Sequence, residues 1–499
     1  MNRKSLVALA LSVAGLSGCA TVNPKQDFDR ASRQIAQATG QEVAVDPTGE
    51  RLTREQITLL LADGLTASEA VQLCLINNPR IQAELLRIGI GRAEFVQSGL
   101  FSNPSLALSL RFPDEGGLAN FEVSLAQNIA ELWQIKHRRK AAERDLDQTI
   151  LKLAREASVL ALDARSAYVR TIQADRNVEL ARENLGIAEQ LVELANARRQ
   201  AGSGTDVDVN LASAERVSLD VKARSAAVAA VTARADLGKL LGLTTPPSEL
   251  ALKDPLPDPQ ELSFDATQVI ETSREHRLDL KAADAVIQAA QSRLEYERSR
   301  IFKNVELGIS MERDERRSRG DRNWLADTAW SSAQAGAPTL PSLQPRDPVA
   351  TDYVTGPTLS LELPLFDQNQ AQVARAEYEL LQVNFLKESI ERDIVQDSWA
   401  AHTRVRVAFE NAKFVRDELI PLREKGLALA REAFRVGNTT ILTTLDAQRT
   451  LLEARTGYIQ AQADAALATI ELERISGLPF ADLAASKDQT KTHNGEVEP

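Results

Sequence analysis

The chain contains two glycine turns with similar surroundings, Gln200-Ala201-Gly202-Ser203-Gly204-Thr205 and Arg435-Val436-Gly437-Asn438-Thr439-Thr440. Each turn separates two long segments of helical character, and a strand-like stretch precedes each pair. Residues 119–243 and 355–478 therefore follow one plan twice: a strand, a very long helix, the turn and a second long helix. A tandem repeat of this length indicates one architectural unit used twice. Helices this long exclude most globular enzymes.

The first residues have the pattern of a secretory signal. Arg3 and Lys4 precede an apolar run from Leu6 to Leu16, which is too short to span a bilayer as a helix. The sequence Leu16-Ser17-Gly18-Cys19 then resembles a bacterial lipobox. That resemblance implies that Cys19 is acylated, becomes the first mature residue and is sorted to the outer membrane. An ordinary signal peptide with a chance cysteine is the alternative.

Composition narrows the possible partners. The 499 residues include 59 Lys and Arg against 70 Asp and Glu, a formal net charge of −11. This balance argues against a nucleic-acid partner, because phosphate neutralisation needs a basic surface. The two cysteines are Cys19 and Cys74, so an acylated Cys19 leaves Cys74 without a disulfide partner. Its apolar neighbours predict that Cys74 is a small buried hydrophobe and not a nucleophile.

Helix signals define the two copies. Thr66 and Glu69 have capping-box spacing at the first helix start, and Asn78-Pro79 predicts a break. Long helices are expected at 132–200, 206–241, 368–435 and 440–476, the first near 100 Å long. Within 368–435 the apolar residues mostly recur at steps of three and four, as in a coiled coil. They are Val373, Ala376, Leu380, Val383, Ile390, Ile394, Val405, Ala408, Ala412, Val415, Leu419 and Leu422.

Each copy also offers two strand-like runs, at 105–112 and 121–125 and at 305–309 and 358–366. No apolar stretch of 18 residues follows the signal, so we expect any membrane-spanning part to be a β-barrel. Four strands cannot close a barrel, because the smallest single-chain barrels have about eight. Other copies of the chain must then complete the sheet edges. We predict a mainly α fold: a tandem-repeat coiled-coil barrel of long helices, plus a transmembrane β-barrel of four strands per chain completed by other copies, where trimerisation would give twelve strands.

The predicted organisation has six segments. They are a signal peptide (1–18), a lipidated leader (19–65), the first repeat (66–243), a Pro-rich linker (244–264), the second repeat (265–478) with a large loop at 313–353, and a disordered tail (479–499).

Residues 66–478 resemble the TolC family of outer-membrane efflux channels. The resemblance rests on the duplicated plan and on the order and spacing of short features. These are Asn77-Asn78-Pro79, Arg277-Leu278-Asp279-Leu280, the Gly202 and Gly437 turns, and Asp446-Ala447-Gln448. It implies a homotrimer with a 12-stranded barrel in outer-membrane lipid and a helical tunnel across the periplasm. It also implies docking to a periplasmic adaptor and an inner-membrane efflux pump, whose substrates the channel conducts passively.

The resemblance also implies site residues. Gly202, Ser203, Val436, Gly437 and Asn438 would lie at the periplasmic tips, where the family's adaptors make contact. The flanking charges suit helix dipoles, so plain capping and adaptor contact both remain open. They are Arg198, Arg199, Arg435, Asp206 and Asp208.

Several family members narrow the tunnel with two acidic rings. The equivalent positions here are Thr443 and Asp446, so this chain departs from the family at the first ring. A ring of Asp446 would attract cations, and a solvated surface carboxylate is the alternative.

Nothing in the sequence predicts catalysis, a cofactor or a metal site. His137, His276, His402 and His493 lack metal-ligand spacing, and no hydrolase or phosphate-binding motif occurs. Three other classes compete with the channel. A periplasmic adaptor would have one hairpin, a structural coiled-coil lipoprotein without channel activity would leave the strands unexplained, and a secreted hydrolase would need a catalytic site.

Overall fold

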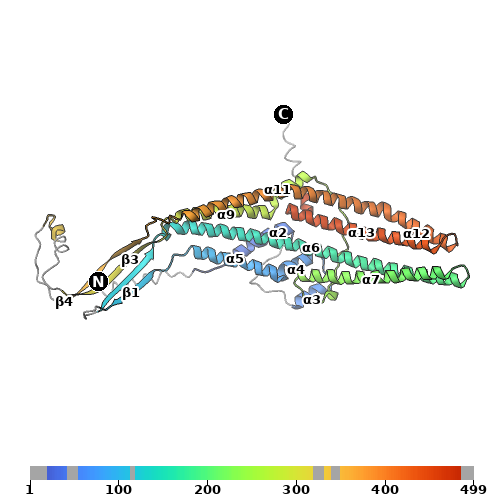
Figure 1. Cartoon of the computed structure of the whole chain (residues 1–499), viewed down its shortest axis with the longest axis horizontal. Helices are drawn as coiled ribbons and strands as arrows, with labels where there is room; N and C mark the ends of the chain where they lie inside the picture. Colours follow the sequence, from blue (N-terminus) through green and yellow to red (C-terminus); the bar gives the residue numbers. More distant parts are fainter. Residues whose placement is uncertain are drawn as a thin grey trace, which may run out of the picture. The chain divides into compact units, whose positions relative to one another are not determined.

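The computed structural model describes residues 20–41, 54–112, 119–244, 246–317, 331–338 and 349–484. The predicted signal peptide and Cys19 lie outside these ranges. The chain divides into two compact units. The helical unit comprises residues 1–94, 143–289 and 381–499, and the sheet unit comprises residues 95–142 and 290–380 (Figure 1). Across the described ranges, no helix is both long enough and apolar enough to cross a membrane.

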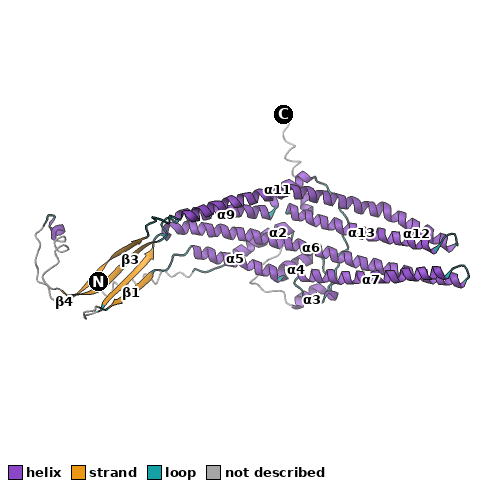
Figure 2. Ribbon diagram, in the orientation of Figure 1, coloured by secondary structure: helices purple, strands orange, loops and turns teal. Residues whose placement is uncertain are grey.

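The sheet unit contains a four-stranded antiparallel sheet in the order β1-β2-β3-β4 (Figure 2). Its strands are β1 (Ser105–Arg111), β2 (Asn120–Asn128), β3 (Val305–Arg317) and β4 (Val349–Leu361). The prediction of two strands in each copy is therefore confirmed. The large loop expected at 313–353 is shorter, because residues 313–317 pair with residues 349–353. The strand predicted to reach Phe366 ends at Leu361, three residues before Pro364, which cannot donate a ladder hydrogen bond.

Two helical hairpins dominate the helical unit (Figure 1). The first consists of α6 (Glu131–Gln200) and α7 (Asp206–Leu240), and α6 alone has 70 residues. The second consists of α11 (Gln370–Phe414), α12 (Ile420–Arg435) and α13 (Ile441–Ser476). The four long helical segments and their bounds agree with the sequence-based expectation to within two residues.

A π-helical turn, Val415–Leu419, interrupts the segment expected to be one continuous helix. Pro421 explains it, because proline has no N–H and its ring would crowd the carbonyl one turn before it. The chain widens instead, and the Ile420 N–H bonds to the Val415 carbonyl. The wider turn shifts later positions around the helix. Leu422, predicted on the coiled-coil seam, is consequently 68% exposed.

Shorter helices precede each strand pair. They are α4 (Ala67–Asn77), α5 (Pro79–Ser98), α8 (Ala266–His276) and α9 (Leu278–Ser299), with breaks at Asn78 and Arg277. The predicted capping box is present, since the Thr66 N–H donates to Glu69 Oε2 at 2.8 Å and the Glu69 N–H donates to Thr66 Oγ1 at 3.2 Å. Cys74 is fully buried as predicted, and burial raises the pKa of its thiol to about 12.

The leader predicted at 19–65 includes two helices. It contains α2 (Lys25–Thr39) and α3 (Arg54–Ala62). Phe28, Ala31 and Ile35 form one buried face of α2, at spacings of three and four residues. Asp27 on that helix is fully buried and accepts two hydrogen bonds from Arg92 of α5, at 2.5 and 2.7 Å. Apolar burial and this ion pair together hold α2 against the helical unit.

The prediction of a disordered tail from residue 479 onward is wrong for residues 479–484. Leu483 is 2% exposed in a core cluster that includes Phe264 and Leu472. The Phe480 ring lies 5.6 Å from the ring of Phe264. Residues 479–484 are therefore part of the folded chain.

Candidate functional site: hairpin tips and sheet face

Both glycine turns adopt backbone conformations that favour glycine. Gly202 has φ 72° and Gly437 has φ 84°, so each lies in the left-handed region where a Cβ is strained. The N–H groups of Ser203 and Gly204 donate to the Arg198 carbonyl at 2.9 and 3.0 Å. In the second turn, the Asn438 N–H donates to the Ala433 carbonyl at 2.8 Å. Each long helix therefore ends with its last carbonyls satisfied by the turn itself.

Four of the predicted tip charges interact within their own hairpin. Arg199 pairs with Asp206 at 3.0 Å, and Arg435 pairs with Glu432 at 2.7 Å. Asp208 accepts from the backbone N–H of Thr205 at 2.9 Å and from its hydroxyl at 2.8 Å. These hydrogen bonds lower the pKa of the Asp208 carboxyl. Asp208 therefore caps α7, whereas Arg199 and Arg435 are held in ion pairs.

Arg198 is different, because it joins the two hairpins. Its Nη1 donates to the carbonyl of Phe434, at the end of α12, and its Nη2 donates to the Ser203 carbonyl at 3.1 Å. Its guanidinium carbon lies 4.3 Å from the centre of the Phe434 ring, a cation–π arrangement. Phe434 is 3% exposed and packs with Ala195, Ala212 and Ile441, so residues from both hairpins form one small core.

A second link joins the hairpins further along α13. Arg455 pairs with Glu183 of α6 at 3.0 Å and with Glu424 of α12 at 2.9 Å. We call the Arg198–Phe434 and Arg455–Glu183 contacts the hairpin latch. Sequence analysis missed both, and no local pattern marks them.

The structure brings the two predicted turns to the same end of the helical unit (Figure 1). Ser203 and Val436 are exposed there, and the exposed fraction of Val436 is 53%. Thr443 and Asp446 are exposed and lie one turn apart on α13. The Thr439 hydroxyl donates to the Thr443 hydroxyl at 3.0 Å. These side chains are therefore accessible for the contacts that the resemblance implies.

The sheet has one apolar and one polar face. Cross-strand pairs such as Leu106–Leu125, Leu125–Ile309 and Leu307–Leu359 form the apolar face. Its side chains are strongly exposed, with 64% for Leu106, 68% for Ile309 and 67% for Leu359. The alternate positions are small or polar, including the pair Ser124–Ser310 and the pair Glu122–Glu312. An apolar patch of this kind marks a membrane or protein contact.

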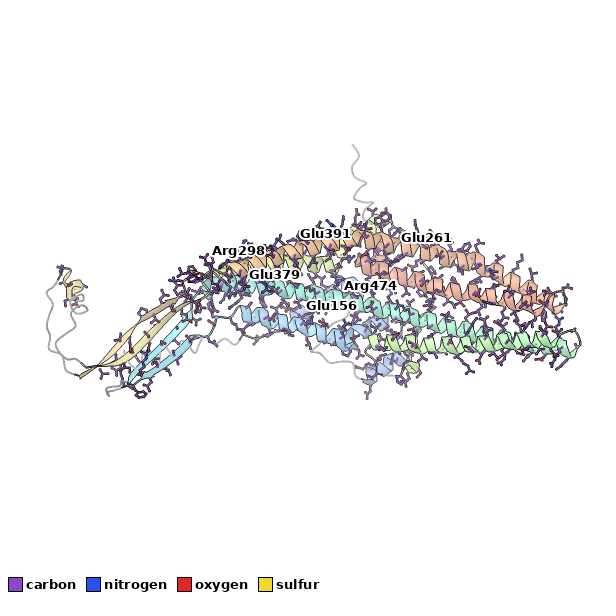
Figure 3. The ribbon with its side chains drawn as sticks, viewed as in Figure 1. Glu156, Glu261, Arg298, Glu379, Glu391 and Arg474 are labelled. Atoms are coloured by element: carbon purple, nitrogen blue, oxygen red, sulfur yellow. The ribbon has the colours of Figure 1, made fainter. Side chains whose placement is uncertain are left out.

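Charged side chains cover the long helices along their lengths, with Glu156, Glu391 and Arg474 as examples from the helical unit (Figure 3). Among the described residues, no group of three or more His, Cys, Asp or Glu side chains could hold a metal ion.

Two long helical hairpins and a four-stranded sheet with an exposed apolar face are thus the two main features of the chain. The model of the outer membrane efflux protein family matches residues 269–478. The cobalt-zinc-cadmium resistance protein CzcC of Cupriavidus metallidurans is 24% identical over 423 residues, which cover 83% of this chain and 91% of that protein. The probable efflux pump outer membrane protein TtgC of Pseudomonas putida is 23% identical over 492 residues, which cover 91% of this chain and 92% of that protein.

A solved structure shares the fold. The open-state crystal structure of the Neisseria gonorrhoeae MtrE outer membrane channel has a TM-score of 0.61 and 18% identity, covering 82% of this chain and 88% of that one. Residues 269–478 therefore match the outer membrane efflux protein family, and the chain is similar to outer membrane efflux proteins along most of its length. That family consists of channel-forming outer-membrane proteins and is not an enzyme family.

Proposed function

We propose that this protein is the outer-membrane exit channel of a tripartite efflux system, and that it works as a homotrimer. The observation that carries the proposal is the sheet. Its apolar face is exposed, and within the described residues the outer sides of β1 and β4 pair with no further strand. In lipid every backbone polar group needs a partner, so these edges must be paired. Pairing β1 of one copy with β4 of the next closes a sheet of twelve strands from three copies.

The helical unit would form the periplasmic tunnel of this trimer. Its tips, at Gly202, Ser203, Val436, Gly437 and Asn438, would receive the periplasmic adaptor that connects the channel to an inner-membrane pump. The names of CzcC and TtgC support this role, because both describe resistance or efflux proteins. Thr443 and Asp446 would face the narrow end, where Asp446 favours cations. The acyl chain on Cys19 would anchor the amino terminus in outer-membrane lipid.

Cross-linking tests the closure of the sheet. In a Cys74→Ser background, Ser109→Cys on β1 is combined in turn with Val354→Cys, Gly356→Cys and Thr358→Cys on β4. All four positions belong to the polar face, so neighbouring copies should bring one pair together. Oxidation should then give dimer and trimer bands on a denaturing gel. Ser124→Cys with Ser310→Cys is the control, because these partners lie on adjacent strands of one chain and should close a disulfide at monomer mass.

The same cross-linked trimers should conduct ions in planar lipid bilayers once the tips are loosened. Monomers for every β1–β4 pair would contradict the homotrimer, and non-conducting trimers would contradict the channel. The lipid anchor has its own test, since Cys19→Ala should abolish incorporation of labelled fatty acid while the secreted protein remains detectable.

A further inference from the structure

Gln448 is a buried polar side chain whose amide has no partner among the described residues. It is 4% exposed, and neither Oε1 nor Nε2 makes a hydrogen bond. Thr444, one turn earlier on the same buried face of α13, is fully buried as well. Its hydroxyl, however, donates to the Ala430 carbonyl of α12 at 3.3 Å. The Thr444 hydroxyl therefore has a hydrogen-bond partner, whereas the Gln448 amide on the same helix face has none.

The hairpin latch brackets Gln448 on both sides. Ile441, seven residues before it, belongs to the core cluster that contains Phe434 and Ala195. Arg455, seven residues after it, pairs with Glu183 of α6. Residues seven apart lie on the same stripe of a helix, two turns along. Gln448 thus lies midway between two residues of the same stripe, Ile441 and Arg455, that contact the first hairpin.

Burying an amide without a partner is unfavourable, because the hydrogen bonds it makes to water are lost and not replaced. An apolar side chain at the same position would carry no such penalty. The penalty would be relieved by a movement of the second hairpin that returns the amide to water.

We propose that Gln448 is a gating residue, which keeps the latched state of the tips from becoming too stable to open. This inference rests on the proposed channel function, in which separation of the hairpins widens the periplasmic end. The latch contacts stabilise the latched state, and the unpartnered amide of Gln448 opposes them. The balance between the two sets how readily the tips separate.

Gln448→Met tests the proposal, because methionine has a similar length and no amide. We expect the ratio of open to closed time in planar bilayers to fall about tenfold, which corresponds to about 1.4 kcal/mol. Backbone amides of residues 441–455 should exchange with deuterium more slowly, and Tm should rise. Thr444→Val is the matched control, because it removes a buried hydroxyl that is already satisfied. That variant should give no rise in Tm and no fall in the open ratio.

The proposal would be overturned if the Gln448→Met variant had the same deuterium-exchange rates and the same ratio of open to closed time as the original protein. The Gln448 amide would then be hydrogen-bonded to water in the latched state. The double variant Arg198→Ala/Arg455→Ala separates this failure from failure of the proposed function. If that variant conducts no ions, the channel function is wrong, and deuterium exchange in residues 441–455 still decides whether Gln448 opposes latching.

Discussion

The guanidinium carbon of Arg198 lies 4.3 Å from the centre of the Phe434 ring, although the two residues are 236 positions apart in the chain. The same arginine donates to the carbonyl of Phe434, so one side chain both covers the ring and satisfies the end of α12. Arg198 of the first hairpin therefore makes two different contacts with the tip of the second. This contact joins the two tips, and its loss should loosen them.

Arg198→Ala should raise the conductance of the reconstituted channel. The variant removes a cation–π contact and a charge-assisted hydrogen bond, which together stabilise the latch by about 1–3 kcal/mol. Single-channel recording measures the effect as a longer open time. Arg199→Ala is the control, because Arg199 pairs with Asp206 in its own hairpin. Equal effects from the two substitutions would show that Arg198 has no special role.

Arg455→Met should open the channel less than Arg198→Ala does. Arg455 is one-third exposed and Glu183 more than half exposed, and such pairs contribute only about 0–1 kcal/mol. The difference between variant and original should also disappear in about 1 M salt, where the screening length is about 3 Å. Recordings at low and high salt check this. Arg449→Met is the control, because Arg449 pairs with Glu453 on the same helix.

Gly437→Ala should destabilise the second turn by about 1–2 kcal/mol, because its φ of 84° is strained for a residue with a Cβ. Space is not the cause, since the nearest atom to an added Cβ would be Arg198 Nη2 at 4.0 Å. Gly437→Asn should recover much of the loss, because asparagine tolerates the left-handed region. Thermal unfolding measures both variants. A loss as large for asparagine as for alanine would contradict the conformational explanation.

Asp27→Asn should release α2 from the helical unit. The substitution removes the buried carboxylate that accepts two hydrogen bonds from Arg92, and because the Arg92 side chain is 21% exposed, the cost should stay below the about 3–5 kcal/mol of a fully buried ion pair. Limited trypsin digestion should then cleave faster after Arg30 and Arg33. Asp29→Asn, at an exposed position of the same helix, should leave the cleavage rate unchanged. Slow cleavage in both variants would mean that apolar burial alone holds α2.

The capping contribution of Asp208 should depend on pH. Its pKa is lowered from 3.8 in the folded chain by the N–H and hydroxyl of Thr205. A lowered carboxyl pKa means that the contribution is present above the unfolded value and is lost as pH falls through the folded one. At neutral pH, Asp208→Ala should lose about 1 kcal/mol. Unfolding at several pH values should show the two proteins converging below pH 3.8, and a constant difference would refute this assignment.

Local pattern predicted much of the fold because the responsible interactions are local. Gly202, Gly437 and Gly477 end helices where the sequence places them, and Thr66 with Glu69 starts one. Alternation of Leu106, Leu108 and Leu110 predicted a strand with one apolar face. The amphipathic face of α2 was detectable in the sequence, in the spacing of Phe28, Ala31 and Ile35, but the polar residues around it hid the signal.

By itself the sequence determined the duplicated plan, the long helices, the turns and the four strands, because each follows from backbone preferences or from the period of side chains along one element. The tertiary structure alone decided the Arg198–Phe434 contact, the burial of Asp27 and the unpartnered amide of Gln448. Contacts between residues hundreds of positions apart depend on how helix faces meet, and no short pattern in the chain records that.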